Sequence, residues 1–225
     1  MQFSLEHRPG NAIARVALEP GESITAEGGA MIAMSGHIGV TTTTHKKGKG
    51  GIGAALKRVF AKESFFLNHF EAAQYPGEVL LGTSLPGDMD VLELNGPTLV
   101  IEGGAYCAST PDVDIDVGWQ GFKNLLSKES MFWITAKGSG KVVIASFGAI
   151  YPIDIDGEYI VDTGHIVAFE ETLDYKLSKA GSSWLHSILG GEGLVCRFKG
   201  KGRVWCQSHN VGGFGSSLTP SLRPR

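Results

Sequence analysis

Cysteine, proline and long apolar runs are scarce in this sequence, and each shortage excludes a class of protein. The three cysteines, Cys107, Cys196 and Cys206, form no Cys-x-x-Cys pair, so neither a disulfide framework nor a cysteine-based zinc site is indicated. The 9 prolines follow no collagen-like period. No segment approaches the ~20 consecutive apolar residues of a membrane-spanning helix. We therefore expect a globular protein of a reducing compartment, with the cytoplasm as its location.

An excess of charge of one sign is also missing. The formal net charge is −3 over 225 residues, so no overall positive field is available to hold nucleic acid. The N-terminal segment has neither the basic start and apolar run of a secretory signal nor an arginine-rich amphipathic leader. This pattern also favours the cytoplasm.

Glycine, by contrast, is abundant, with 32 residues in 225, about twice the typical share of roughly 7%. The excess predicts many tight turns between short strands. Residues 112–117 alternate strictly between acidic and apolar side chains. This alternation predicts a strand whose acidic face carries Asp112, Asp114 and Asp116.

Similar segments occur three times along the chain. Glu-Gly-Gly-Ala stands at 27–30 and again at 102–105. Glycine turns between two apolar runs contain Gly77, Gly140 and Gly202, which are 63 and 62 residues apart. Such a regular period indicates internal repeats.

A stretch with helical periodicity precedes each pair of apolar runs. In the first copy Ile52, Leu56 and Phe60 fall on one helical face, and the later stretches contain Phe122 and Trp184. Each unit therefore combines short antiparallel strands, one short helix and a hairpin.

The predicted fold class is mainly β. We expect three repeats, at about 1–87, 88–152 and 153–211, in a pseudo-threefold β-sandwich or barrel-like assembly. One such unit is too small to bury its own apolar faces, so the three are expected to share a single domain, 1–211. Residues 212–225 are rich in glycine, serine and proline and are predicted to form a flexible tail.

These marks resemble the mitochondrial-biogenesis family typified by altered-inheritance-of-mitochondria protein 24, over about residues 1–210. The resemblance rests on the segments 27–30 and 102–105, on Lys-Glu-Ser at 62–64 and 128–130 before aromatic strands, and on the glycine hairpins. It implies a β fold akin to the tryptophan RNA-binding attenuator proteins, with three repeats as a pseudo-trimer, and no established catalysis. Those proteins bind RNA through repeated basic residues, and no such set recurs at equivalent positions here.

Patterns that carry chemistry are missing. No Gly-x-Ser-x-Gly element supports a nucleophile, the histidines show no metal-ligand spacing, and the glycines at 48–53 lack the ending of a phosphate loop. The acidic strand fails as a calcium loop, because Val117 and Lys123 stand where glycine and glutamate are required. We predict no catalytic residue, cofactor or metal site and a packing role for the cysteines. A weak cation site on the acidic strand stays open.

One segment is strongly basic. It spans the 17 residues 46–62 without an acid and carries an apolar stripe. Its basic residues are Lys46, Lys47, Lys49, Lys57, Arg58 and Lys62. This combination is typical of helices that bind anionic membranes or acidic partners. The alternative is a core helix with a solvated outer face.

Three aromatic residues are candidates for an apolar contact patch. If threefold packing gathers the helices at one end, Phe60, Phe122 and Trp184 form a surface for an oligomer or membrane contact, or they fill the core between repeats.

The leading functional hypothesis is a non-enzymatic scaffold or binding module that forms homo-oligomers and lies peripheral to an anionic membrane. An RNA-binding module is the alternative, against which stands the sequence pI of 6.2. An enzyme whose site is invisible in the sequence is the third.

Overall fold

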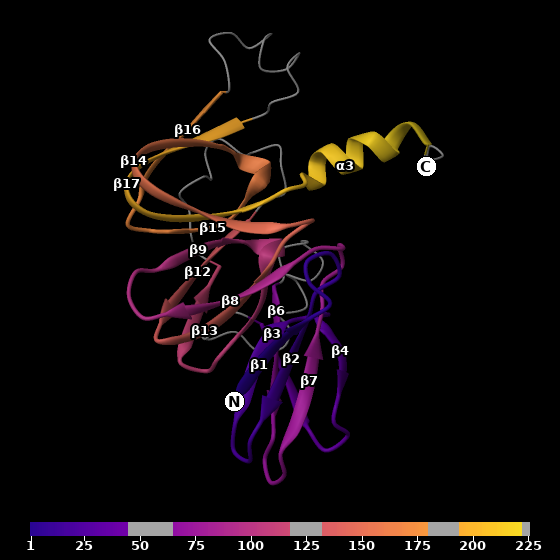
Figure 1. Cartoon of the computed structure of the whole chain (residues 1–225). Helices are drawn as coiled ribbons and strands as arrows, with labels where there is room; N and C mark the ends of the chain where they lie inside the picture. Colours follow the sequence, from indigo (N-terminus) through magenta and orange to yellow (C-terminus); the bar gives the residue numbers. More distant parts are fainter. Residues whose placement is uncertain (45–64, 118–131, 180–193, 222–225) are drawn as a thin grey trace.

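The computed structural model describes residues 1–44, 65–117, 132–179 and 194–221, and most of this part of the chain is β-strand (Figure 1). The strands form three sheets, and the strands within each sheet pair antiparallel. The predicted mainly β fold is confirmed.

A four-stranded sheet carries the N-terminus, in the order β1-β2-β7-β4. In β2 the side chains of Ala14, Val16 and Leu18 are buried and alternate with more exposed neighbours. This period of two makes the segment a strand with one face in the core. The strands are β1 (Gln2–Glu6), β2 (Ile13–Leu18), β4 (Met31–Met34) and β7 (Gly77–Leu81).

The second sheet has six strands, in the order β5-β6-β3-β10-β13-β8. Every residue of β10 is buried, as expected of a strand covered on both faces. The strands are β3 (Ser23–Glu27), β5 (Gly39–Thr44), β6 (Phe66–Glu71), β8 (Met89–Leu94), β10 (Tyr106–Ser109) and β13 (Gly140–Ala145).

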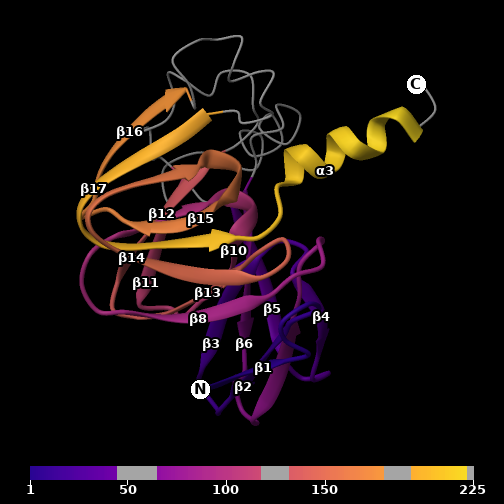
Figure 2. The same ribbon diagram turned by 45° about the horizontal axis from the view of Figure 1, so that its top comes forward.

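The third sheet follows the order β11-β12-β9-β15-β17-β14, and β16 also pairs with β17. The long strands β14 and β17 pair along their whole length. In Figure 1 and Figure 2 they lie at the end of the molecule opposite β1 and β2. The strands are β9 (Leu99–Glu102), β11 (Val113–Asp116), β12 (Trp133–Gly138), β14 (Ile150–Asp162), β15 (Ile166–Glu170), β16 (Asp174–Lys179) and β17 (Leu194–Gln207).

One set of strand pairings occurs three times. β2 pairs with β7, β8 with β13, and the first half of β14 with the second half of β17. Likewise β3 pairs with β6, β9 with β12, and the second half of β14 with the first half of β17. Two further pairings, β3 with β10 and β9 with β15, connect consecutive parts of the chain. We call these two pairings the internal junctions.

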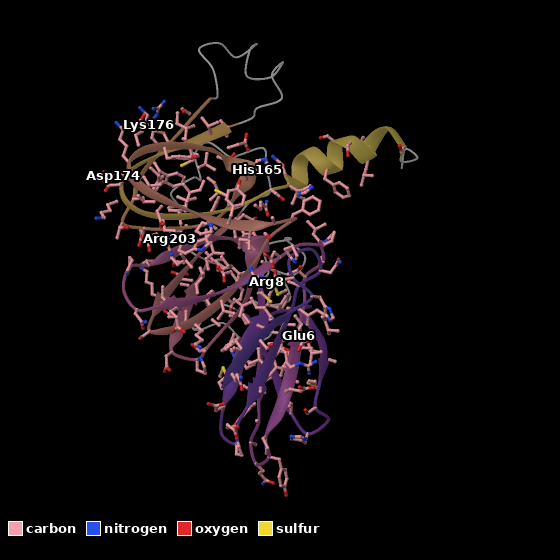
Figure 3. The ribbon with its side chains drawn as sticks, viewed as in Figure 1. Glu6, Arg8, His165, Asp174, Lys176 and Arg203 are labelled. Carbon is pink, nitrogen blue, oxygen red and sulfur yellow. The ribbon has the colours of Figure 1, made fainter. Side chains whose placement is uncertain are left out.

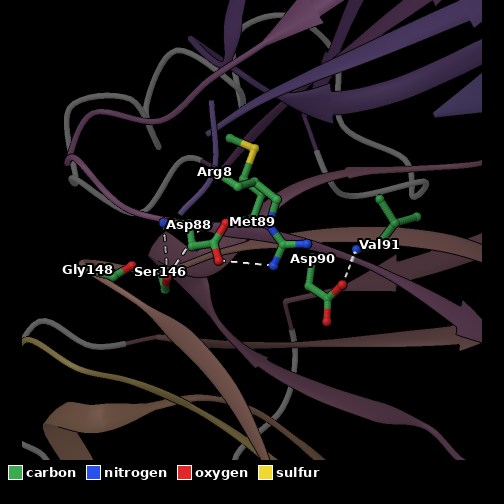
Figure 4. Close-up of polar contacts among 7 residues, drawn as sticks. All are labelled: Arg8, Asp88, Met89, Asp90, Val91, Ser146 and Gly148. Atoms are coloured by element: carbon green, nitrogen blue, oxygen red, sulfur yellow. Dashed lines mark hydrogen bonds and ion pairs between the residues drawn. The ribbon is translucent and has the colours of Figure 1, made fainter. Parts of the chain in front are cut away.

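A partly buried ion pair ties the N-terminal segment to the start of β8 (Figure 4; Arg8 is also labelled in Figure 3). The guanidinium of Arg8 donates to both carboxylate oxygens of Asp88, at 2.7 and 3.0 Å, and the Asp88 side chain is only 5% exposed. Beside it, a Cβ on Gly87 would lie 1.8 Å from the carbonyl oxygen of Ser146. The chains approach too closely here for any residue except glycine.

Three clusters of buried apolar side chains fill the interior. The second cluster combines Leu99, Tyr106, Ile134 and Val167, which come from β9, β10, β12 and β15, so strands of two sheets share it. No helix in the described ranges is long and apolar enough to span a bilayer.

The expected barrel-like closure is wrong, because all three sheets formed by the described residues are open. A barrel requires every strand edge to be paired. In the described part of the chain, β4 and β14 each end a sheet and do not pair with each other.

The expected short helices fall at 45–64, 118–131 and 180–193, outside the described residues. Near the C-terminus, residues Val211–Leu218 form helix α3, followed by the 3-10 turn η3 (Thr219–Ser221). The predicted flexible tail, 212–225, begins within this helix. Asn210 caps the helix by accepting from the amide of Gly213 at 3.1 Å, and such a cap offsets part of the cost of helical glycines. Figure 1 shows α3 projecting away from the sheets.

Candidate ligand cavity

Three acidic corners of the fold line one cavity of about 1030 Å³. Each corner consists of an acid that is the last residue of a strand and of the turn that follows it: Glu27 ends β3, Glu102 ends β9, and Asp162 ends β14. The short turns η1 (Gly103–Ala105) and η2 (Thr163–His165) follow the second and third corners. The first turn of α3 also lines the cavity.

Each corner is fixed by a hydrogen bond to the strand beside it. The amide of Gly28 donates to the carbonyl of Phe66, and the amide of Gly103 donates to that of Phe132, both at 2.8 Å. At the third corner the hydroxyl of Thr163 donates to the carbonyl of Leu194 at 2.9 Å. The three acids therefore stand on anchored backbone rather than on free loops.

The glycines of the corners are required by space and conformation. Gly29 has a φ of 98°, which L-residues rarely adopt. A Cβ on Gly103 would lie 2.3 Å from the ring of Phe132. These two positions explain one glycine in each of the first two corners.

Burial dominates the electrostatics of the two glutamates. Burial first, and the neighbouring charge of Glu102 second, raise the pKa of Glu27 to about 7. Burial also raises the pKa of Glu102 to about 7, although the amides of Gly104 and Ala105 donate to its carboxylate and oppose the shift. Among the described residues, Glu27 has no hydrogen-bond or ion-pair partner for its carboxylate. Both groups therefore carry a fractional charge near neutral pH.

Polar contacts hold the third corner. Asp162 accepts from the amide of Gly164 at 2.8 Å. The Gln207 side chain accepts from the amide of Phe147 at 2.9 Å and donates to the carbonyl of Gly164 at 3.0 Å. Nδ1 of His165 lies 2.8 Å from the carbonyl oxygen of Gln207, close to the start of α3 (Figure 3). This network joins the corner to the end of β17.

The described wall of the cavity contains three acids and no lysine, arginine or histidine. Its other members are glycines, uncharged polar residues such as Gln207 and Asn210, and apolar residues such as Leu85 and Phe147. A wall of this composition is electronegative and suits a partly apolar cation.

Comparison with known proteins shows the family to which this chain belongs. The family described as Mitochondrial biogenesis AIM24 matches residues 3–209. The chain belongs to this family. The match confirms the resemblance seen in the sequence.

Relatives of this AIM24-family chain occur in Streptococcus pyogenes. An uncharacterised protein of serotype M6 is 27% identical over 224 residues, covering 97% of this chain and 90% of the relative. A crystal structure of an S. pyogenes protein superimposes with a TM-score of 0.79 at 27% identity, covering 98% of this chain and 99% of that one.

The predicted surface residues lie outside the part of the chain that the structure describes. These are the basic segment, Lys46, Lys47, Lys49, Lys57, Arg58 and Lys62, and the aromatic patch, Phe60, Phe122 and Trp184. Their roles stay predictions.

The acidic strand and the cysteines lie within the described ranges. In β11 Val113 and Ile115 are buried while Asp114 and Asp116 are exposed, which confirms the predicted two-faced strand. No group of three metal-ligating side chains lies close together in the described ranges. The cysteines are buried and free of disulfides, and burial raises the pKa of each thiol to about 12. A packing role fits this burial.

The sequence does not predict the cavity. In it Glu27 and Glu102 stand out only as markers of repetition, and the third corner is hidden because Asp162-Thr163-Gly164 shares just one glycine with Glu-Gly-Gly. The usable signal was an acid at a strand end, followed by a turn and an apolar strand. Only the fold shows that the three corners converge.

Proposed function

We propose that this AIM24-family chain is a non-enzymatic, self-associating binding module whose three repeats gather one acid each around a cavity for a small organic cation. The observation that carries the proposal is the cavity wall, which has three carboxyl groups and, in its described part, no basic side chain.

Recurring contacts support the three repeats. β4, β10 and β15 each pair with the return strand of their own unit through a register shift near the strand start. The turn after each of these strands also recurs, since the amides of Ile38, Val113 and Leu173 donate to the carbonyls of Ser35, Thr110 and Glu170 at 3.0 to 3.1 Å. These equivalences suit three copies of one unit around a pseudo-threefold axis.

The size and charge of the cavity support a cationic ligand. About 1030 Å³ is the size of a pocket for a small organic molecule and far exceeds the space of a metal ion. A cation that enters replaces the protons on Glu27 and Glu102 and pairs with charges that are costly when buried alone. An amine or guanidinium with an apolar stem matches both kinds of wall.

Spermidine is a suitable probe, measured by calorimetric titration at pH 7 and moderate salt. We expect saturable binding that weakens by about tenfold or more, or ~1.4 kcal/mol, when Glu27→Gln and Glu102→Gln are combined. Glu71→Gln, an exposed acid at the end of β6, is the matched control and should bind as the native chain does. Equal affinity in all three proteins would reject the cavity as the site.

Peripheral membrane attachment is the second part of the proposal, and the six basic residues of segment 46–62 support it. Anionic lipid attracts such segments by about 1 kcal/mol per basic residue, and salt screens the attraction. In co-sedimentation, the chain should bind vesicles with anionic lipid and lose binding at high salt. Exchanging Lys46, Lys47 and Lys49 for glutamine should weaken it. Equal binding to neutral and anionic vesicles contradicts this part.

A further inference from the structure

β4 and β14 each have an unpaired edge in the described ranges, whereas the equivalent strands elsewhere in the fold are paired along that edge. The internal junctions pair β3 with β10 and β9 with β15. By the recurring pairings, β4 is the counterpart of β10 and β15, and the second half of β14 is the counterpart of β3 and β9. In the described ranges, β4 and β14 are the end strands of their sheets. A third junction of the same kind is therefore missing.

The exposure of β4 matches that missing neighbour. Met31 is 40% exposed and Ile32 is 54% exposed. Their counterparts at the internal junctions are Tyr106 and Cys107 in β10, and Ile166 and Val167 in β15. All four counterparts are at most 1% exposed.

The second half of β14 shows the same contrast. Tyr159 and Ile160 are each 47% exposed. At the position of Tyr159 the internal junctions have Ile24 and Leu99, which are 0% and 3% exposed, and Val100 at the position of Ile160 is fully buried. Both edges thus expose apolar side chains that the other copies bury.

The two edges carry little of the usual protection against pairing. Free edges in soluble proteins are commonly blunted by charged side chains or proline. Met31–Met34 has neither, and Tyr159–Asp162 has one charged residue, Asp162, at its end, after the apolar pair Ile160-Val161. Such edges are templates for another strand.

We propose that a second copy of this chain fills the missing junction, so that Met31–Met34 of one copy pairs antiparallel with Tyr159–Asp162 of the next. Each copy offers one edge of each kind, so the contact is head-to-tail and builds a ring or a filament. This inference specifies the partner and surface of the proposed self-association and is independent of the cavity ligand.

The internal junctions set the register. Ala108 faces Ala26 and Ser109 faces Thr25 at the first, and Ala168 faces Ile101 and Phe169 faces Val100 at the second. The same register places Ala33 opposite Val161 and Met34 opposite Ile160 of the other copy. Opposed residues of antiparallel strands have Cα atoms roughly 4.5 to 5.5 Å apart, which suits a disulfide.

A second copy is favoured over closure within one chain by the pairings that the structure shows. In the described ranges β4 ends the four-stranded sheet and β14 ends the seven-stranded sheet, and the two strands do not pair with each other. Each edge is therefore left for another molecule.

Cysteine crosslinking between separately purified chains tests the register. Met34→Cys and Ile160→Cys chains, mixed and oxidised, should form a covalent dimer at least fivefold faster than Met34→Cys mixed with Tyr151→Cys. Tyr151 is a matched control, because it is 44% exposed and lies in the other half of β14. The native cysteines are buried and should not contribute.

Light scattering of the unmodified chain separates the interface from self-association itself. We expect a mass above the 23.9 kDa of one chain, lowered to one chain by Ile32→Asp and unchanged by Val40→Asp, which is on β5 and 42% exposed. Circular dichroism confirms folding of each variant. An oligomer without the Met34–Ile160 crosslink overturns this interface while leaving self-association. A monomeric chain overturns the inference altogether. A crosslink within one chain, when Met34→Cys and Ile160→Cys are combined in the same molecule, overturns it as well.

Discussion

Glu102 is an ionisable side chain that the fold keeps close to its titration point. Burial raises its pKa to about 7 from the 4.5 of an exposed glutamate, and a raised pKa of an acid means that the folded protein holds the proton more tightly than the unfolded chain does. Below pH 4.5 both states are protonated. As the pH rises from 4.5 to about 7, the folded state loses stability, because the unfolded chain releases this proton while the buried carboxyl still holds it; above pH 7 both states are ionised and the loss is complete.

Glu102→Gln should remove this dependence. The quantity to compare is the free energy of unfolding of Glu102→Gln minus that of the native chain. We expect this difference to be roughly 1–3 kcal/mol larger at pH 8 than at pH 4.5. Urea titrations at the two pH values measure it. Glu71→Gln is the exposed control and should show no such gain. A Glu102→Gln difference that stays constant across this range would mean that the carboxyl is not held in a costly environment.

Close backbone contact is a second residue-scale feature that can be tested. A Cβ on Gly87 would meet the carbonyl oxygen of Ser146, whereas a Cβ on Gly10 has no atom within 4 Å. We expect Gly87→Ala to cost more than ~2 kcal/mol and Gly10→Ala to change stability by less than ~0.5 kcal/mol. Thermal unfolding compares the two. Similar Tm values would contradict the close approach.

At the scale of elements, the sequence predicts strands well and their arrangement poorly. The predicted strand at residues 112–117 is seen as β11, because alternation is a local signal. The return strands after Gly77, Gly140 and Gly202 are likewise β7, β13 and the end of β17. These runs are apolar, short and bounded by glycine.

Sequence patterns do not predict helix α3 or the openness of the sheets, for physical reasons. Val211–Leu218 contains three glycines, which have low helix propensity, so its formation depends on the Asn210 cap and on the contact of Phe214 with Phe147 at 5.2 Å between ring centres. Openness depends on whether distant strands meet, and no local pattern records that. The acidic cavity was missed for the same reason, since Glu27, Glu102 and Asp162 are 135 residues apart from first to last.

At the scale of the whole molecule, two incomplete features lie side by side. The cavity gathers three acids without a basic partner in its described wall. Ala30, which precedes β4, and Asp162, which ends β14, both line it, and in the described ranges each of these strands ends its sheet. A ligand and a second copy are separate means of completing the structure. If both proposals hold, the Ile32→Asp chain loses self-association and still binds spermidine, provided that the neighbouring copy adds no group to the cavity.

Proton release on spermidine binding tests the cavity most directly. At pH 7 both glutamates are about half protonated, because each has a pKa of about 7. A bound cation lowers both values and expels on the order of one proton per ligand. Calorimetry in two buffers of different ionisation enthalpy counts that proton. The account predicts release in the native chain and none in the chain with Glu27→Gln and Glu102→Gln. Binding without proton release in the native chain would contradict it.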